Sequence, residues 1–309
     1  MDKLEACPTL AIRANPCASV AKNISTILLI DVGNTNTHIG LATEKKIFAQ
    51  TNIPTTSLPA GSLTRVTKKL LSKIVGRECL DTNRGFAPLR TAGNPSGMPA
   101  LQRKRDGKKI SGAIIASVVP KMIPVLRVEL ARQFRITPLI VTADIPLGVK
   151  VDYPNRKQIG ADRLANAVGV FKRYGAPAVV VDFGTAVTFD IVDKRGAYIG
   201  GVIAPGLAAM TDYLYQRTAL LPKIDLAEPR SMIGKNTVYA MQIGAVVGYR
   251  GLIKEILTDV KRELQTKKLH VVATGGYSKL IAKKIPAIQH VNPLLTLEGL
   301  RFIYVRNLG

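Results

Sequence analysis

Short apolar runs alternate with stretches of helical periodicity in the first half of the chain. Unbroken apolar runs predict buried strands, whereas apolar residues spaced three and four apart predict helices. The resulting order is three strands, a helix, a strand, a helix and a strand. These elements are predicted at residues 27–41 (two strands around a turn), 46–51, 63–74, 112–119, from 120 onward and at 138–141. Residues 77–109 lose this periodicity and contain several glycines and prolines, so we expect a loop or insertion there.

The second half of the chain repeats this plan after a helix that is expected to begin at residue 161. Three strands are predicted at 179–182, 187–192 and 197–203, followed by helices at 206–218 and 238–257 and a strand at 270–274. Gly244 and Gly248 lie inside the longer helix. Because glycine lets a neighbouring backbone approach, these two residues predict close packing against another helix, either of this chain or of a second subunit.

The turn between the first two strands carries the first candidate chemistry. It reads DVGNTNTH at residues 31–38. Gly33 has no Cβ, so an anion can approach its backbone, and Thr35 and Thr37 add hydroxyl donors. A carboxylate beside such a loop repels phosphate unless a hydrated Mg²⁺ lies between them, which would explain Asp31. A simple polar hairpin turn is the alternative interpretation of this stretch.

A similar pattern recurs about 150 residues later. Residues 179–191 read VVVDFGTAVTFDI and place Asp182, Gly184, Thr185 and Thr188 in nearly the same register as the first loop. A repeat at this distance indicates two related halves rather than a solenoid. A duplicated strand, phosphate loop and strand resembles the actin-like ATPase superfamily, which includes sugar and acetate kinases. The fold class implied is α/β, with two ribonuclease-H-like βββαβαβ domains and a nucleotide cleft between them.

Residues 160–163, Gly-Ala-Asp-Arg, form the predicted first turn of the helix that starts at residue 161. Asp162 has two candidate roles. It could cap exposed N–H groups and complement the helix dipole. It could instead act as a general base, with Arg163 beside it to bind an anionic substrate.

Composition narrows the choice of partners and compartment. The 309 residues are 47% hydrophobic, enough for two domains of ordinary size. The formal net charge of +23 favours anionic ligands, but the basic residues are dispersed and no nucleic-acid motif interleaves them with aromatic residues. We therefore expect no specific nucleic-acid partner. Three cysteines without metal or disulfide spacing favour a reducing cytoplasm, and no apolar stretch is long enough to cross a membrane.

Five motifs together resemble one family, the type III pantothenate kinases. They are DVGNTNTH at 31–38, GADR at 160–163, DFGTAVT at 182–188, GGVIAPG at 200–206 and ATGG at 273–276. The resemblance runs from about residue 26 to the end, apart from the insertion. The implied organisation is an extension at 1–25, an N-terminal actin-like domain at 26–146 with an insertion at about 80–109, and a C-terminal actin-like domain at 147–309.

The resemblance also implies a role for individual residues. Asp162 would accept the proton of the pantothenate hydroxyl and Asp182 would hold a monovalent cation, K⁺ or NH₄⁺. ATP, used with Mg²⁺, would be bound by Asp31, Val32, Gly33, Asn34, Thr35, Asn36, Thr37, His38 and Thr185. Pantothenate would be bound by Tyr153, Gly160, Ala161, Asp162, Arg163 and Thr237. Thr237 would lie near the interface of a homodimer.

Two positions depart from the family pattern. Relatives usually read Tyr-x-Asn-Pro before the GADR turn, whereas this chain has Tyr153-Pro154-Asn155-Arg156. His38 follows the first-loop threonines where Lys is common, and it is expected at a strand start rather than in proton transfer. The expected function is ATP-dependent phosphorylation of pantothenate to 4′-phosphopantothenate, the first step of coenzyme A biosynthesis. The alternatives are a non-catalytic nucleotide-binding regulatory protein and a kinase for another small alcohol.

Overall fold

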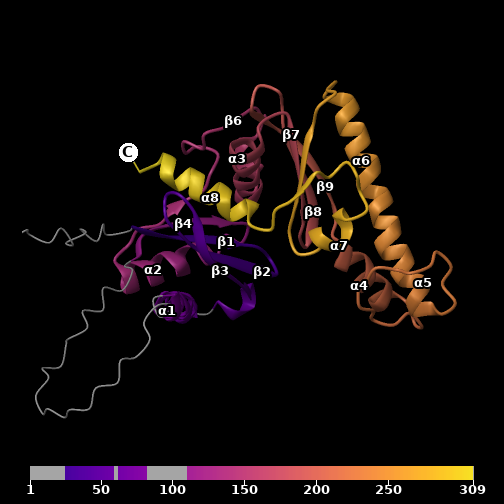
Figure 1. Cartoon of the computed structure of the whole chain (residues 1–309), viewed down its shortest axis with the longest axis horizontal. Coiled ribbons are helices and arrows are strands. Elements are labelled where there is room, and N and C mark those ends of the chain that lie inside the picture. Colours follow the sequence, from indigo (N-terminus) through magenta and orange to yellow (C-terminus); the bar gives the residue numbers. More distant parts are fainter. Residues whose placement is uncertain (1–24, 59–61, 82–109, 309) are drawn as a thin grey trace, which may run out of the picture.

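The computed structural model describes residues 25–58, 62–81 and 110–308 and contains two β-sheets with helices on their faces (Figure 1). The N-terminal extension and most of the predicted insertion lie outside these residues. The strands of the first sheet are β1 (Thr26–Val32), β2 (Asn36–Ala42), β3 (Ile47–Pro54), β4 (Ile110–Ser117) and β5 (Leu139–Ile140). The strands of the second are β6 (Lys150–Val151), β7 (Ala178–Phe183), β8 (Ala186–Val192), β9 (Ala197–Pro205), β10 (His270–Thr274) and β11 (His290–Val291).

The two sheets share one topology. The first has the strand order β3-β2-β1-β4-β5, with antiparallel pairing among β1, β2 and β3 and parallel pairing of β1, β4 and β5. The second repeats this as β9-β8-β7-β10-β11, with β6 added beside β9. This confirms the predicted duplicated βββαβαβ fold.

The helices lie outside and between the sheets. They are α1 (Ser62–Asp81), α2 (Met122–Phe134), α3 (Ala161–Tyr174), α4 (Leu207–Arg217), α5 (Thr237–Ile243), α6 (Tyr249–Glu263), α7 (Ser278–Ala282) and α8 (Leu295–Arg306), with short 3₁₀ turns at Thr55–Ser57 and Arg156–Gln158. Helices α1 and α2 cover one face of the first sheet, and α6 and α7 cover the far face of the second. None of the helices in the described ranges is long and apolar enough to span a bilayer.

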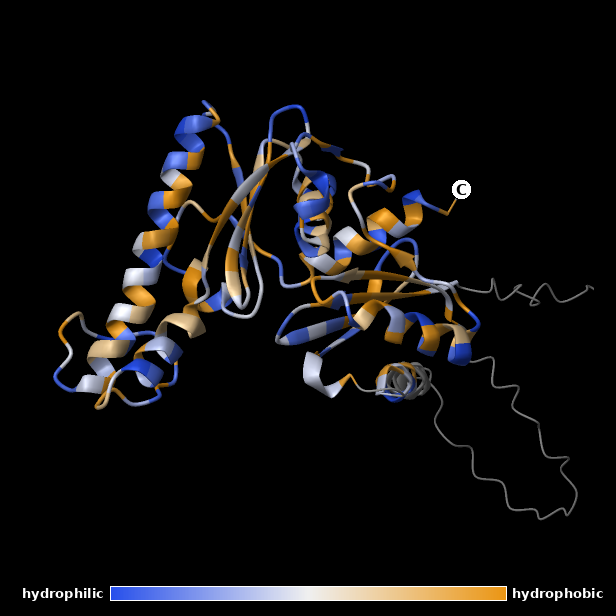
Figure 2. Cartoon of the chain, turned by 180° about the vertical axis from the view of Figure 1, so that it is seen from behind, coloured by the Kyte–Doolittle hydropathy of each residue, from blue (hydrophilic) through white to orange (hydrophobic). Residues whose placement is uncertain are grey.

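Alternation along each strand decides which side chains face the layer between the sheets. On β1, Ile27 and Leu29 face that inner layer, whereas Leu28 and Ile30 face α1 and α2. Figure 2 shows that hydrophobic residues, in orange, run along the central strands of both sheets. The inner layer is formed by α3 and α8, which pack along each other.

Two details of the predicted helices are wrong. The first helix was expected to give way to a loop at residue 77, but α1 continues to Asp81. The long helix at 238–257 runs further, from α5 through a π-helical turn at Gly244–Gly248 into α6. A Cβ on Gly244 or Gly248 would meet no atom within 4 Å. The two glycines therefore do not accommodate another helix from the described part of the chain, and packing against a second subunit stays a prediction.

Helix α8 packs across the predicted boundary between the two domains at residue 146. Although it ends the second half of the chain, it packs on strands β1, β2 and β4 of the first sheet. The hydrophobic cluster around α3 and α8 also includes inner-face residues of both sheets. The boundary between the two domains stays a sequence-based prediction.

Candidate active site

Three aspartates reach the inner layer because of strand alternation. Asp31 follows Leu29 by two positions on β1, and Asp182 follows Val180 by two positions on β7. Asp190 precedes the inner-facing Val192 on β8. All three carboxyl groups therefore lie on the inner faces of their sheets, away from the outer helices.

Asp162 lies in the first turn of α3, as predicted. Its Oδ1 accepts the backbone N–H of Arg163 at 2.8 Å, so the carboxylate satisfies one exposed donor of the helix start. The helix itself begins after Gly160, which has no side chain to cap it. The capping contact and a role as a base are compatible, because a carboxylate has a second oxygen free to accept a proton.

A buried polar network connects α3 to the second sheet and to α8. Arg163 Nε lies 2.6 Å from Asp190 Oδ1, and the Asp190 side chain is fully buried. The Asn166 amide donates to Asp182 at 3.0 Å and to Asp190 at 3.3 Å, and its own oxygen accepts the Thr296 hydroxyl of α8 at 2.7 Å. The network fixes the orientation of the Asp182 and Asp190 carboxylates.

Burial raises the pKa of each of these carboxyl groups. For Asp31 the pKa lies well above its ordinary value, with further increases from the charges of Asp162 and Asp182. Burial also raises the pKa of Asp162, against the opposing effect of Arg163. The pKa of Asp182 is about 6 and that of Asp190 is about 7, in both cases chiefly because of burial. The charge of Asp162 contributes to the raised pKa of Asp31, Asp182 and Asp190, so these carboxylates lie close enough to repel one another. Such repulsion favours a cation among them.

The two glycine–threonine loops meet. The hydroxyls of Thr35 and Thr185 are 2.9 Å apart, so the β1–β2 and β7–β8 turns lie against each other. Both threonines are exposed. The first turn is braced from within, because Thr55 donates to the Gly33 carbonyl at 2.7 Å and bonds the buried Thr37 hydroxyl at 3.0 Å.

The backbone around the second loop is tightly packed. A Cβ on Gly206 would lie 2.2 Å from the Thr185 carbonyl oxygen, so only glycine allows β9 to end against this loop. Gly275 has φ +84°, and a Cβ there would lie 2.6 Å from Asp182 Oδ1. The GGVIAPG and ATGG motifs thus bring backbone, rather than side chains, to the second loop.

The remaining candidates of the first loop differ in exposure. Val32 and Thr37 are buried, whereas Asn34 and Asn36 are exposed. His38 lies in β2 directly opposite Asp31 in the ladder, and burial lowers its pKa, which favours the neutral ring. Its position at the start of the strand is as expected.

The predicted pantothenate residues fall into two places. Tyr153 lies near Tyr198 with ring centroids 6.3 Å apart, and the Arg163 guanidinium lies 5.8 Å from the centroid of the Tyr198 ring. Tyr153 thus neighbours Tyr198, which in turn lies beside Arg163 of the 160–163 turn. Thr237 is exposed at the start of α5, which Figure 1 shows at the far end of the second half from α3. No contact within the described residues joins it to the others.

Asn166, Asp190 and Thr296 were missed by sequence reasoning. Asn166 is fully buried and follows Asp162 by four positions on the same helix face. A polar residue on the buried face of a helix was the available signal for it. Asp190 belongs to the second repeated motif but has no counterpart in the first loop, so the comparison of the two motifs gave it no role.

The carboxylate of Asp31 is a suitable ligand for a divalent cation that is bound together with a nucleotide. In the described part of the chain no group of three or more His, Cys, Asp or Glu side chains is placed to hold a metal ion by itself. Mg²⁺ commonly takes one or two protein carboxylates and completes its shell with water and phosphate oxygens. Asp31 lies beside the glycine–threonine loop, and burial together with its carboxylate neighbours raises its pKa, so it fits this pattern.

Two sheets of one topology, with paired aspartate and threonine loops in contact, define an actin-like ATPase fold. The comparisons with known proteins identify the branch of this superfamily. The family model described as type III pantothenate kinase matches residues 91–259. The chain belongs to this family.

Individual relatives agree. A type III pantothenate kinase of Koribacter versatilis is 40% identical over 281 residues, covering 91% of this chain and 96% of the relative. One from Akkermansia muciniphila is 52% identical over 202 residues, covering 65% of this chain and 81% of the relative. A solved structure described as a Baf family transcriptional activator from Campylobacter jejuni aligns with TM-score 0.50 at 18% identity, covering 91% of this chain and 98% of that one, and shows likeness of fold alone.

Proposed function

We propose that the protein transfers the γ-phosphoryl group of ATP to the hydroxyl of pantothenate and forms 4′-phosphopantothenate, the first step of coenzyme A biosynthesis. The observation that carries the proposal is the placement of Asp162. This carboxylate lies beside Arg163 and is electrostatically coupled to Asp31 on the opposite loop. A base at that position would face both an anionic acceptor bound by Arg163 and a phosphate donor bound at the first loop.

The reaction needs alignment and charge neutralisation more than covalent chemistry. Asp162 would accept the hydroxyl proton, and burial helps by raising its pKa toward the working range of a base. Arg163 would bind the acceptor, while Asp190 holds the guanidinium in place. Asp31 would bind Mg²⁺, and the hydroxyls of Thr35 and Thr185 would donate to the ATP phosphates. Mg²⁺ neutralises phosphate charge when bound.

Turnover is the direct test. A coupled assay measures ADP release with ATP and pantothenate, next to reactions without an acceptor and with a panel of other small alcohols. We expect ADP and 4′-phosphopantothenate in equal amounts, dependent on pantothenate. Nucleotide binding without turnover of any alcohol would indicate the regulatory alternative, and preference for another alcohol would indicate a different kinase.

We propose a monovalent cation, K⁺ or NH₄⁺, at Asp182. Its carboxylate is oriented by Asn166 and carries a raised pKa, which a nearby cation would reverse. Activity should rise on exchanging Na⁺ for K⁺ at constant ionic strength, and Asp182→Ala should lose that response. Full activity of the wild type in Na⁺ alone contradicts the assignment.

We propose a homodimer formed through α4, α5 and the segment between them. Several large hydrophobic side chains are exposed there, although such side chains are usually covered. They are Met210, Tyr213, Leu214, Tyr215, Leu220, Met232, Ile233 and Val238. Light scattering should give a dimer for the wild type and a monomer for Leu220→Asp, because Leu220 is 90% exposed in the single chain. Val128→Asp on α2 is the matched control, at 68% exposure outside this surface.

Such a dimer would explain why Thr237 lies away from Asp162. We propose that Thr237 of one subunit completes the pantothenate site of the other. Asp162→Asn and Thr237→Ala proteins should each be nearly inactive, but mixed subunits should regain activity, because one of the two sites then has both native residues. If mixing restores nothing although hybrid dimers form, Thr237 does not act across the interface.

We further propose that the protein works in the cytoplasm without a specific nucleic-acid partner. The cysteine usage and the dispersed basic residues support this. A large preference for one DNA or RNA sequence over random sequence at physiological salt would contradict it.

A further inference from the structure

Tyr153 is carried by a short segment with little support from regular structure. Strand β6 before it has only two residues, which pair with Ala197 and Tyr198 of β9. After β6, the Asp152 N–H donates to the Tyr198 carbonyl at 2.8 Å. The backbone then leaves the sheet, so the position of Tyr153 depends on the contacts of residues 151–156.

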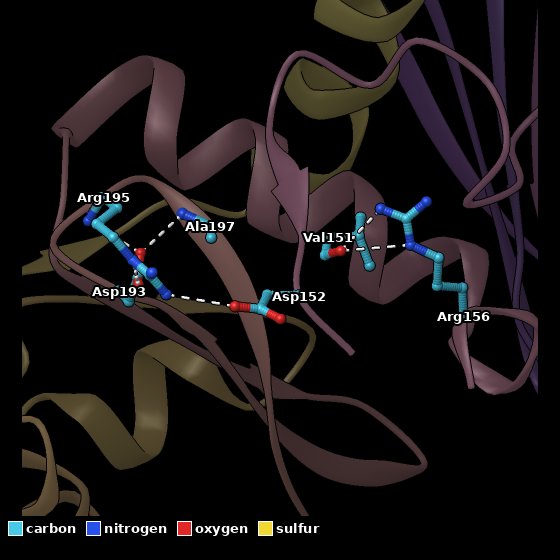
Figure 3. Close-up of polar contacts among 6 residues, drawn as sticks. All are labelled: Val151, Asp152, Arg156, Asp193, Arg195 and Ala197. Carbon is cyan, nitrogen blue, oxygen red and sulfur yellow. Dashed lines mark hydrogen bonds and ion pairs between the residues drawn. The ribbon is translucent and has the colours of Figure 1, made fainter. Parts of the chain in front are cut away.

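Arg156 closes this segment from its far end. Its Nη2 and Nε donate to the Val151 carbonyl at 2.8 and 3.3 Å, as Figure 3 shows. Both ends of the segment are thereby joined through one guanidinium group. On one side the segment borders a cavity of about 520 Å³ that is lined by residues 143–151, Arg156 and Arg306. Val151 and Tyr153 pack against the core around α3, so on the cavity side the polar contacts of Arg156 are what ties the end of the segment back to Val151.

Arg195 holds the near end of the segment. Its Nη2 lies 3.3 Å from Asp152 Oδ2, and its Nε lies 2.7 Å from Asp193 Oδ2 (Figure 3). Asp193 is itself fixed, because its Oδ1 accepts the N–H groups of Arg195 and Ala197, each at 2.9 Å. The β8–β9 turn thus provides a rigid base from which Arg195 reaches the residue next to Tyr153.

The ring of Tyr153 is placed against the second sheet as a result. Its edge lies over Gly200, where a β-carbon would come within 3.3 Å of it. The ring also neighbours Tyr198, which lies beside Arg163. A change in the 151–156 segment would therefore move a predicted pantothenate contact without touching Asp162 or the ATP loops.

We propose that Arg156 and Arg195 are positioning residues that hold the 151–156 segment closed and so set the affinity for pantothenate. The inference rests on the proposed function for the identity of the substrate. Neither guanidinium is assigned to the substrate or to ATP. Each acts through Tyr153.

The test compares Arg156→Ala and Arg195→Ala with the wild type in steady-state kinetics. We expect the KM for pantothenate to rise about 3- to 10-fold in each variant, the range for losing one ordinary hydrogen bond or one exposed ion pair. The kcat and the KM for ATP should stay within about twofold, since the chemistry and the ATP loops are untouched. Arg156→Lys should recover only part of the loss, because lysine lacks the fork that reaches the carbonyl with two donors.

Arg132→Ala is the matched control, since Arg132 is exposed on α2 and has no polar partner in the described structure. Amide hydrogen exchange gives a second readout that needs no activity. It should be faster at residues 151–158 in both variants and unchanged in α3. An unchanged pantothenate KM together with unchanged exchange overturns the inference. If the wild type does not phosphorylate pantothenate, the proposed function fails, and the exchange comparison still decides whether the two arginines hold the segment.

Discussion

The Thr35 hydroxyl lies 2.9 Å from the Thr185 hydroxyl, although 150 positions separate the two residues in the chain. The contact joins the turns that follow β1 and β7, which are equivalent strands of the two sheets. In each half the strand before the turn carries an aspartate, four residues before Thr35 and three residues before Thr185. The duplicated halves therefore bring their two glycine–threonine loops against each other.

Thr185→Val should weaken ATP binding about 3- to 10-fold, because it removes a hydroxyl that contacts Thr35 and that we propose to contact the nucleotide. The KM for pantothenate should change little. Calorimetric titration with a non-hydrolysable ATP analogue measures the first quantity and steady-state kinetics the second. Thr185→Ser retains the hydroxyl and should bind like the wild type; equal weakening in both variants would assign the effect to packing.

Asp162→Asn should lower kcat by about 10²–10⁴-fold, the usual contribution of a positioned base, with ATP affinity unchanged. The Asn side-chain oxygen can still accept the Arg163 N–H, so the start of α3 is preserved. Thermal unfolding checks that the variant folds normally. Near-normal turnover in Asp162→Asn, combined with a lowered melting temperature in Asp162→Ala, would reduce the residue to a helix cap.

The unliganded protein should gain stability when Asp182 is replaced by Asn, and the gain should grow with pH. Burial raises the pKa of Asp182 to about 6, whereas the unfolded chain has a value of about 3.9. Between these values the unfolded state loses its proton first, so the free energy of unfolding of the wild type falls as pH rises. The difference from Asp182→Asn should approach about 3 kcal/mol above pH 6 and disappear below pH 4, at about 1.4 kcal/mol per pKa unit.

This comparison uses denaturant unfolding without K⁺, Mg²⁺ or ATP, because a bound cation would restore the stability of the wild type. The exposed Asp144→Asn is the control for a carboxylate removed outside the network. A difference between Asp182→Asn and wild type that is constant from pH 4 to pH 8 would show that the Asp182 carboxylate is not penalised by burial.

Asp190→Ala should destabilise the fold by about 3–5 kcal/mol, because it leaves the buried Arg163 guanidinium without its ion partner. Asn166 loses one of its two acceptors as well. Removal of the exposed Asp259, which pairs with Arg262, should cost at most about 1 kcal/mol. Urea unfolding compares the two variants, and equal losses would mean that the Arg163–Asp190 pair is solvated like a surface pair.

The succession of strands and helices along the chain, the two loops and the place of Asp162 were predictable from the sequence alone. Local rules determine these features. Apolar runs specify strands, glycine and threonine specify the turns, and the periodicity after residue 160 specifies a helix with Asp162 in its first turn. The repeat of the first motif at Asp182 also predicted the duplicated fold that the two equivalent sheets confirm.

Only the tertiary structure decided how the loops meet and what surrounds the aspartates. The Thr35–Thr185 contact, the link from Thr296 on α8 to Asn166, and the Arg163–Asp190 pair each join residues from different elements. Sequence periodicity tells which face of an element is buried but not which element covers it. That choice comes from the packing of whole helices and sheets. It places α8, near the end of the chain, against the first sheet, where Thr296 holds Asn166 and so helps to orient Asp182.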